Sequence, residues 1–167
     1  IDRELLSRHR EGLICLSGCL AGQIPQLLLE NRDAEAAAVA GAYAEIMGPG
    51  AFYLELQNHF LPGQEVVNKG LVRLSRELGI PLVATNDLHY IHKSDAQAHD
   101  VLLCIQTGKN IRDQDRLRFP TPEFYLKTTS EMYDLFGELP GALENTLAIA
   151  ERCHVELRFD QVYLPEY

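Results

Sequence analysis

Short apolar runs alternate with helical patterns over the first two thirds of the chain, and this alternation constrains the fold more than any other feature. The apolar runs are GLICLS (12–17), FYLELQ (52–57) and PLVAT (81–85), and each has the length of a strand. The segments between them repeat apolar residues every three or four positions, which predicts helices. Such alternation is typical of parallel strands joined by helical crossovers, so we expect an α/β fold.

Capping signals mark the ends of the expected helices. The candidate starts are Asp2 with Ile1 and Leu6 as a hydrophobic staple, a short helix within 22–30, Asp33, Pro62, and the pairs Ser94 with Gln97 and Thr128 with Glu131. The candidate ends are the glycines of 48–50 and Gly79. The helix after Ser94 carries Ala98, Val101, Leu102 and Ile105 on one face.

The character of the sequence changes after residue 108. The segment GKNIRDQDRLRFPTPE (108–123) is polar, basic in places and punctuated by prolines, which predicts an extended loop or linker. We expect a short strand at 123–127, helices from Thr128 and from Pro140, and a final strand at 154–159. Three or four strands cannot close a barrel of about eight, so the fold is part of a barrel or a small open sheet.

Charge and hydropathy limit the partners of the chain. The net charge is −9, from 24 acidic and 15 basic residues, which argues against binding a phosphate backbone by charge alone. A nucleic-acid partner would therefore need a metal or another domain to supply positive charge. No stretch approaches the roughly 18 apolar residues of a membrane span, and no cationic leader opens the chain, so we expect no membrane partner. A start at Ile1 and an end at LPEY suggest a piece of a longer protein.

The four cysteines show no zinc-finger spacing, which favours a reduced, cytoplasmic protein. We expect Cys15, Cys104 and Cys153 to be core thiols, because their neighbours are apolar. Cys19 is different, because it follows the strand expected at 12–17.

Side chains that bind metals follow each expected strand. His59 comes after the strand at 52–57, and Asp87 and His89 come after the strand at 81–85. Sites in α/β folds form at the carboxyl ends of strands, and residues two apart in an extended segment point to one side. A thiolate, a carboxylate and an imidazole together suit zinc or a similar divalent ion.

Ordinary explanations exist for the same residues. An Asp-x-His tripeptide is commonly a turn acid beside a surface histidine, and His59 could cap a turn. We expect four other side chains to be solvated: His92, His99, Asp113 and Asp115. Zinc needs about four ligands, so the site is either structural and weak or completed by residues outside this chain.

Several longer segments resemble the alpha-subunit family of bacterial DNA polymerase III. These are GLICLSGCLAGQIPQLLL, FYLELQNHFLPGQ, IPLVATNDLHYIHKSDAQAHDVLLCIQTGK and FYLKTTSEMYDLFGELPGALENTLAIAERC. The resemblance implies that residues 1–108 are the second half of a PHP (polymerase and histidinol phosphatase) domain, a distorted (β/α)7 barrel. It also implies that residues 109–167 are a linker and helices leading to the polymerase palm.

In that family the barrel holds up to three divalent metals. The resemblance carries ligand roles onto Cys19 of the SGC motif and onto Asp87 and His89 of the NDxHY motif. His59 of the LQNH segment becomes a neighbour of the site. The metal is expected to be zinc, with manganese or magnesium as alternatives. The leading H-x-H motif and the catalytic aspartates of the palm lie outside this chain.

The resemblance implies a parent enzyme that copies DNA in chromosome replication, with primer-template DNA and other replicase subunits as partners. Its PHP site resembles a 3′–5′ proofreading exonuclease, although the fragment alone is expected to be inactive. A second possibility is a metal-stabilised module that braces the polymerase or docks a proofreading partner. A third is a free-standing PHP phosphoesterase, which the helices of 128–153 disfavour.

Overall fold

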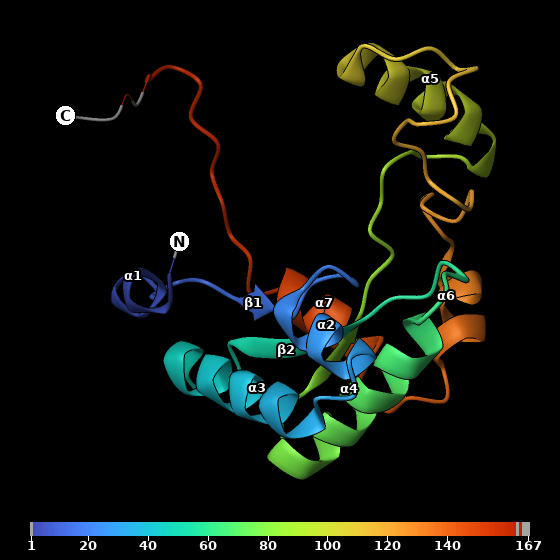
Figure 1. Ribbon diagram of the computed structural model, residues 1–167. Helices are drawn as coiled ribbons and strands as arrows, with labels where there is room; N and C mark the ends of the chain where they lie inside the picture. Colours follow the sequence, from blue (N-terminus) through green and yellow to red (C-terminus); the bar gives the residue numbers. More distant parts are fainter. Residues whose placement is uncertain (1, 163, 165–167) are drawn as a thin grey trace.

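The computed structural model describes residues 2–162 and 164, and a three-stranded parallel sheet lies at its centre (Figure 1). The strands are β1 (Cys15–Leu16), β2 (Phe52–Leu56) and β3 (Leu82–Ala84), and they pair in sequence order. Cys15 lies opposite Phe52, and Leu54 lies opposite Leu82. The predicted α/β fold with parallel strands is thus confirmed, and the described residues form a small open sheet.

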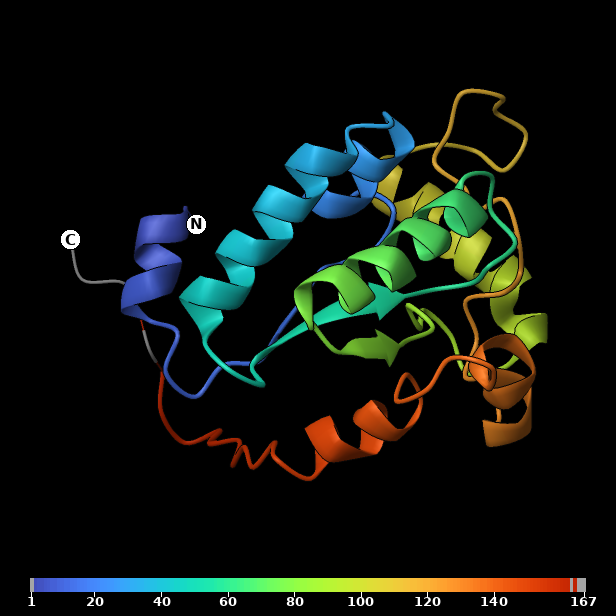
Figure 2. The same cartoon turned by 90° about the horizontal axis from the view of Figure 1, so that it is seen from below.

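Helices cover both faces of this sheet. The first four are α1 (Arg3–Arg8), α2 (Gln23–Leu29), α3 (Asp33–Met47) and α4 (Gln64–Leu78). Figure 2 shows α3 and α4 on one side of the sheet and α7 (Glu144–Ala150) on the other. Both faces of the strands are therefore buried, which explains why β2 and β3 read as nearly continuous apolar runs.

The core lies between the sheet and α2, α3 and α4. Leu54 and Leu56 of β2 are fully buried, and they pack in one cluster with Leu71 and Leu74 of α4. Val67 of α4 is buried as well, so the three- and four-residue spacing of apolar residues marks the face that packs on the sheet. Gly79 ends α4 in the left-handed conformation, which glycine adopts readily, so the predicted end of this helix is confirmed.

Some predicted caps are present and others are not. Asp2 accepts a hydrogen bond from the backbone of Leu5, and Thr128 and Glu131 form the predicted capping box of α6 (Thr129–Phe136). The expected staple includes Ile1, which lies outside the described residues.

Three predicted helix starts were wrong. Asp33 is inside the first turn of α3 and pairs with Arg73 instead of capping. Helix α4 begins at Gln64, after Pro62 and a left-handed Gly63. The expected box of Ser94 and Gln97 is replaced by one between His92 and Asp95, because a short 3-10 turn, η1 (Lys93–Asp95), precedes α5 (Ala96–Thr107).

Helix α5 lies away from the sheet (Figure 1). The apolar face predicted from the sequence is exposed, with Leu102 at 59% and Ile105 at 72% of full exposure. The helix instead buries Leu103 and Cys104. This difference arises because α5 packs against the loop that follows it, where Arg116 pairs with Asp100.

The last third of the chain contains less regular structure than predicted. Residues 109–122 form the expected loop, but the expected strand at 123–127 is reduced to a single bridge between Tyr90 and Tyr125. The expected strand at 154–159 is wrong, because no described segment pairs with it. Val155, Leu157 and Phe159 are 70–90% exposed there.

The outer edge of β3 is already occupied. The backbone of Ala84 donates to the carbonyl of Ala142, and the side chain of Asn145 donates to the carbonyl of Leu82. Strand β1 forms the other edge of the sheet, and no described strand pairs with its outer side.

The cysteines differ in their burial. Cys104 is buried and Cys15 is half-buried, as core thiols should be. Cys153 is exposed, so its predicted place in the core was wrong. Among the described residues, no helix combines the length and apolar character that crossing a membrane requires.

Candidate metal site

The carboxyl ends of the three parallel strands lie side by side at one end of the sheet. Glu55 of β2 connects these strand ends by hydrogen bonds. Its carboxylate accepts hydrogen bonds from the backbone N–H of Gly18, 3.1 Å away, from the side-chain amide of Gln57, 2.9 Å away, and from the hydroxyl of Thr85. Sequence reasoning missed this residue. The available signal was a single acid within an otherwise apolar strand.

Cys19 follows β1 in a tight turn. The backbone N–H of Gly22 donates to the carbonyl of Cys19, and a side chain at Gly22 would come within 2.6 Å of the carbonyl oxygen of Ser17. The thiol of Cys19 is exposed, and Cys19 lines a small cavity together with Glu55 and Gln57. A ligand could therefore reach this thiol from solvent.

Asp87 and His89 are in contact after β3. Their side chains are 37% and 34% exposed, and His89 Nδ1 lies 3.9 Å from a carboxylate oxygen of Asp87. The same Nδ1 lies 2.6 Å from the backbone carbonyl oxygen of Asp87. Because a carbonyl can only accept, Nδ1 carries the proton in the neutral ring and Nε2 keeps its lone pair for a metal.

The backbone at Asp87 is unusual. Its φ is +43°, in the left-handed region that residues other than glycine seldom adopt. The backbone N–H of His89 is then fixed to the carbonyl of Phe124 at 2.8 Å. Strained conformations of this kind are concentrated at functional sites, where surrounding contacts hold them in place.

His59 plays a different part from the other candidates. It is only 1% exposed, and both ring nitrogens have partners within the protein. Nε2 is 2.9 Å from the carbonyl oxygen of Asn86, and Nδ1 is 3.0 Å from the amide nitrogen of Gln64. The ring also stacks on Phe124 at 4.1 Å.

These contacts leave no ring nitrogen of His59 free for a metal. Burial lowers the pKa of His59, and the weaker effects of the Asn86 carbonyl and the Asp87 charge oppose that shift. The neutral ring therefore accepts from Gln64 and donates to Asn86. His59 is thus a buried support that holds Asn86, the residue before Asp87, and its place beside a metal site stays a prediction.

Asn86 connects the end of β3 to the segment 123–127. Its amide nitrogen donates to the carbonyls of Glu123 and Tyr125, at 3.1 and 2.6 Å. The carboxylate of Glu123 is itself held by Lys127 and Lys93, at 3.1 and 2.6 Å. This network fixes the loop that carries Asp87 and His89, and its long sequence separations hid it from sequence analysis.

Aromatic rings surround His89. Its ring meets Phe119 edge to face at 4.6 Å and His99 at 5.6 Å. The prediction that His99 is solvated was wrong, because the helix α5 turns its partly buried ring toward His89. His92, Asp113 and Asp115 are exposed, as predicted.

The structure thus brings together two of the three predicted ligands. Asp87 and His89 fit a divalent cation by ligand type, accessibility and tautomer. Cys19 does not join them: within residues 2–162 and 164, no group of three or more His, Cys, Asp or Glu side chains is arranged to hold a metal. Since zinc takes about four ligands, a complete site needs further groups.

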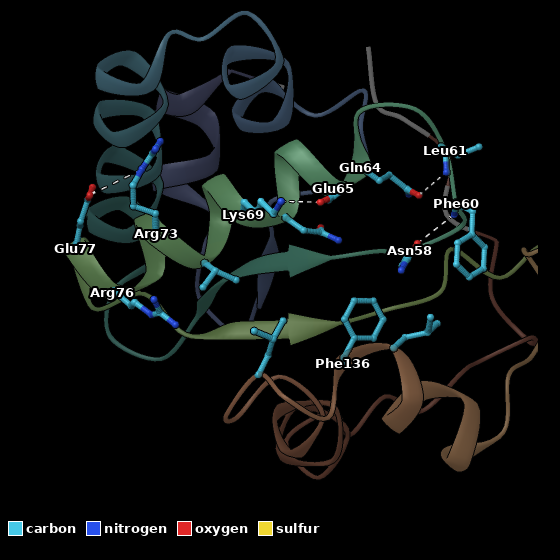
Figure 3. Close-up of a pocket in the computed structure, with 14 residues that line it drawn as sticks. Asn58, Phe60, Leu61, Gln64, Glu65, Lys69, Arg73, Arg76, Glu77 and Phe136 are labelled. Carbon is cyan, nitrogen blue, oxygen red and sulfur yellow. Dashed lines mark hydrogen bonds and ion pairs between the residues drawn. The ribbon is translucent and has the colours of Figure 1, made fainter.

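A large groove lies elsewhere, between α4 and the region of α6 (Figure 3). It measures about 980 Å³, and its walls include Val72, Leu135 and Leu139. Figure 3 shows its rim, where Lys69 pairs with Glu65 and Arg73 approaches Glu77. None of the predicted metal ligands lines this groove.

Comparison with known proteins identifies two levels of similarity. Residues 1–59 match the PHP domain family. The sheet extends past the end of this match, because β3 lies beyond residue 59. The domain boundary expected near residue 108 stays a prediction. The match therefore covers the turn of Cys19 but ends before Asp87.

The whole chain also has relatives in bacteria. It is 46% identical to DNA polymerase III subunit alpha of Borreliella burgdorferi and 47% identical to that of Treponema pallidum, over 100% of this chain in both cases. It is 46% identical to the Thermus aquaticus protein of the same name over 94% of this chain. The chain spans only 13–15% of the length of these relatives. It therefore corresponds, over its full length, to one segment of DNA polymerase III subunit alpha, and the first part of that segment matches the PHP domain.

Proposed function

We propose that this chain is a segment of the catalytic alpha subunit of a bacterial replicative DNA polymerase, and that it supplies part of a PHP metal site with 3′–5′ exonuclease activity. The contact between Asp87 and His89 at the carboxyl edge of the sheet carries the proposal. It joins a carboxylate and an imidazole with a free Nε2 at the place where α/β folds bind ligands.

Cys19, Asp87 and His89 would hold a divalent cation in the complete domain, with zinc favoured and manganese or magnesium as alternatives. Such a cation supplies Lewis acidity toward a phosphodiester. Asp87 offers two oxygens, and the Asp87 carbonyl keeps His89 oriented with Nε2 outward. Cys19 would bind as a thiolate. The chain itself carries a net charge of −9, so its own surface does little to attract the DNA strand.

The remaining parts of the proposal concern the longer protein. DNA synthesis would reside in a palm outside these residues, and the isolated segment would have neither activity. Primer-template DNA and other replicase subunits would be its partners, without a membrane. The location would be cytoplasmic, because a protein that copies the bacterial chromosome acts in the cytoplasm.

A structural role is the second candidate. The hydrogen-bond network of His59, Asn86 and Glu123 would brace the polymerase or a docked proofreading protein, and the metal would add stability. The separation of Cys19 from the other two ligands favours this reading. A free-standing phosphoesterase is disfavoured, because the similarity to the polymerase subunit extends over the entire chain.

Trimming of a mismatched primer by the longer protein tests the proposal. Asp87→Asn should abolish trimming while DNA synthesis stays intact, and Asp115→Asn, an exposed acid of the linker loop, is the matched control. Equal trimming by wild type and Asp87→Asn would reject an exonuclease at this site. Absence of trimming in wild type, with a lower melting temperature on metal removal, would support the structural role.

A further inference from the structure

Glu55 is an acid in the middle strand of the sheet, and the strands on both sides of it lead to predicted metal ligands. Strand β2 pairs with β1 on one side and with β3 on the other. Cys19 follows β1, and Asp87 and His89 follow β3. Glu55 itself is half-buried. It therefore lies between the two parts of the candidate site.

The two carboxylate oxygens of Glu55 face different strands. Oε2 accepts a hydrogen bond from the backbone N–H of Gly18 at 3.1 Å. Oε1 accepts a hydrogen bond from the hydroxyl of Thr85. Gly18 directly precedes Cys19, and Thr85 lies two residues before Asp87. One carboxylate thus holds both of the segments that carry the ligands.

Further contacts fix the position of this carboxylate. The backbone N–H of Glu55 donates to the hydroxyl oxygen of Ser17 at 2.8 Å, so main chain and side chain both connect it to the segment after β1. The amide nitrogen of Gln57 lies 2.9 Å from Oε1 and 3.2 Å from the hydroxyl oxygen of Thr85. The carbonyl of Gln57 in turn accepts a hydrogen bond from Asn68 of α4 at 2.9 Å. The carboxylate is therefore held in place before any metal binds.

These hydrogen bonds explain how Glu55 can affect a metal without binding it. A carboxylate offers about four places for hydrogen-bond donors, and three donors already contact this one. Hydrogen bonds to a carboxylate are about twice as strong as those between neutral groups. Loss of the carboxylate would remove the acceptor of the Gly18 N–H and of the Thr85 hydroxyl. The segments that carry Cys19 and Asp87 would then lose their common support.

We propose that Glu55 is a positioning residue of the metal site, which sets the spacing between Cys19 and the pair formed by Asp87 and His89. The proposal rests on the proposed function above, because it concerns how the same three ligands are held. Groups that orient metal ligands from behind commonly determine the affinity for the metal. Metal binding should therefore depend on Glu55, although its own oxygens hold protein donors.

Binding of Co²⁺ by the longer protein tests the proposal. Cobalt accepts the same ligand types as zinc, and a cobalt–thiolate bond gives an ultraviolet charge-transfer band. The part of this band that Cys19→Ser abolishes reports on Cys19. We expect Glu55→Ala to raise the Kd for Co²⁺ roughly 10- to 100-fold and to reduce the Cys19 band per bound cobalt. Glu45→Ala is the matched control, because Glu45 is an exposed glutamate of α3, and it should change neither quantity.

Two milder variants separate positioning from stability. Glu55→Gln keeps the length of the side chain and one acceptor oxygen, so it should restore part of the affinity that Glu55→Ala loses. Thr85→Val keeps the shape of the side chain and removes the hydroxyl that bonds to Oε1. We expect it to raise the Kd about 2- to 10-fold, as loss of one hydrogen bond does. These two variants decide the question even where Glu55→Ala does not fold.

The outcomes also distinguish this proposal from the proposed function. A lower unfolding midpoint with wild-type Kd and band in the folded variants would overturn the positioning role and leave the exonuclease standing. Cobalt binding that depends on Glu55, in a protein that never trims DNA, would support the positioning role and reject the exonuclease. A wild-type protein without a Cys19-dependent cobalt band would reject both.

Discussion

The Nδ1 atom of His89 lies 2.6 Å from the backbone carbonyl oxygen of Asp87. Asp87 has a left-handed backbone conformation, with φ at +43°. The chain therefore leaves the extended path of β3 at the residue that makes this contact. One candidate ligand thereby orients the ring of the other through its main chain. The arrangement matches the common pattern in which a metal-binding histidine donates its second N–H to a carbonyl.

Removal of this ring should weaken metal binding by the longer protein. We expect His89→Ala to raise the dissociation constant by at least about tenfold, the lower end of the loss seen when even an outer partner of a ligand is removed. Titration with a metal-sensitive competitor dye measures the change. His9→Ala is the control, because His9 is exposed at the end of α1. Equal affinities in the two variants would exclude His89 as a ligand.

His59 should matter for stability and not for metal content. His59→Phe keeps the stack on Phe124 but removes the acceptor of the Gln64 side-chain N–H and the donor to the Asn86 carbonyl. Each buried group left unsatisfied costs about 1–3 kcal/mol. Urea unfolding monitored at this domain should show the loss, while the metal content stays at the wild-type value. A variant that loses metal without losing stability would contradict the assignment.

The buried His59 also predicts a dependence of stability on pH. Burial holds its pKa below the usual 6.5. Below about pH 6.5 this residue is protonated in the unfolded chain but stays neutral in the folded chain. The free energy of unfolding therefore falls as the pH falls toward the pKa of the folded state. The slope reaches at most about 1.4 kcal/mol per pH unit. Above this window the effect vanishes.

Unfolding midpoints between pH 7.5 and 5 check this prediction by difference. The wild type should lose more stability with acid than His59→Phe, which lacks the titrating ring. Parallel curves for the two proteins would mean that His59 titrates alike in the folded and unfolded states.

The capping box of α6 gives a local test of the fold. Thr128 accepts from the backbone of Glu131, and the Glu131 carboxylate accepts from the backbone and hydroxyl of Thr128. Thr128→Ala should lower the free energy of unfolding by about 1 kcal/mol. Ser130→Ala, an exposed change in the same helix, should leave it within about 0.5 kcal/mol. Hydrogen exchange across residues 129–136 reports both effects, and similar protection in the two variants would contradict the cap.

Local patterns predicted the elements whose determinants are local. The parallel sheet follows from apolar runs separated by helical segments, and α4 follows from the spacing of Val67, Leu71 and Leu74. The caps at Asp2 and Thr128 also depend on residues only three positions away. For the same reason, the sequence placed Asp87 and His89 together.

Features set by distant contacts escaped prediction. Glu55 binds Gly18 and Thr85, which are 37 and 30 positions away, so its role depends on the finished sheet. The apolar face of α5 was correctly recognised as a stripe, but which face is buried depends on the loop that contains Arg116. Alternating apolar residues at 154–159 have the pattern of a strand, yet a strand exists only where another backbone pairs with it.

The two edges of the sheet give it a direction of growth. Residues near the end of the chain, Ala142 and Asn145, cover β3, whereas β1 has no described strand beside it. In a longer polypeptide, any strand that joins this sheet must therefore add at β1. The strands already follow one another in chain order, so an added strand from an upstream segment would continue the series. A ribosome would then deliver each new strand to the edge formed by the one before it, and the late helix α7 would close the last edge. Assembly of this domain could keep pace with translation, with little strand edge exposed at any moment.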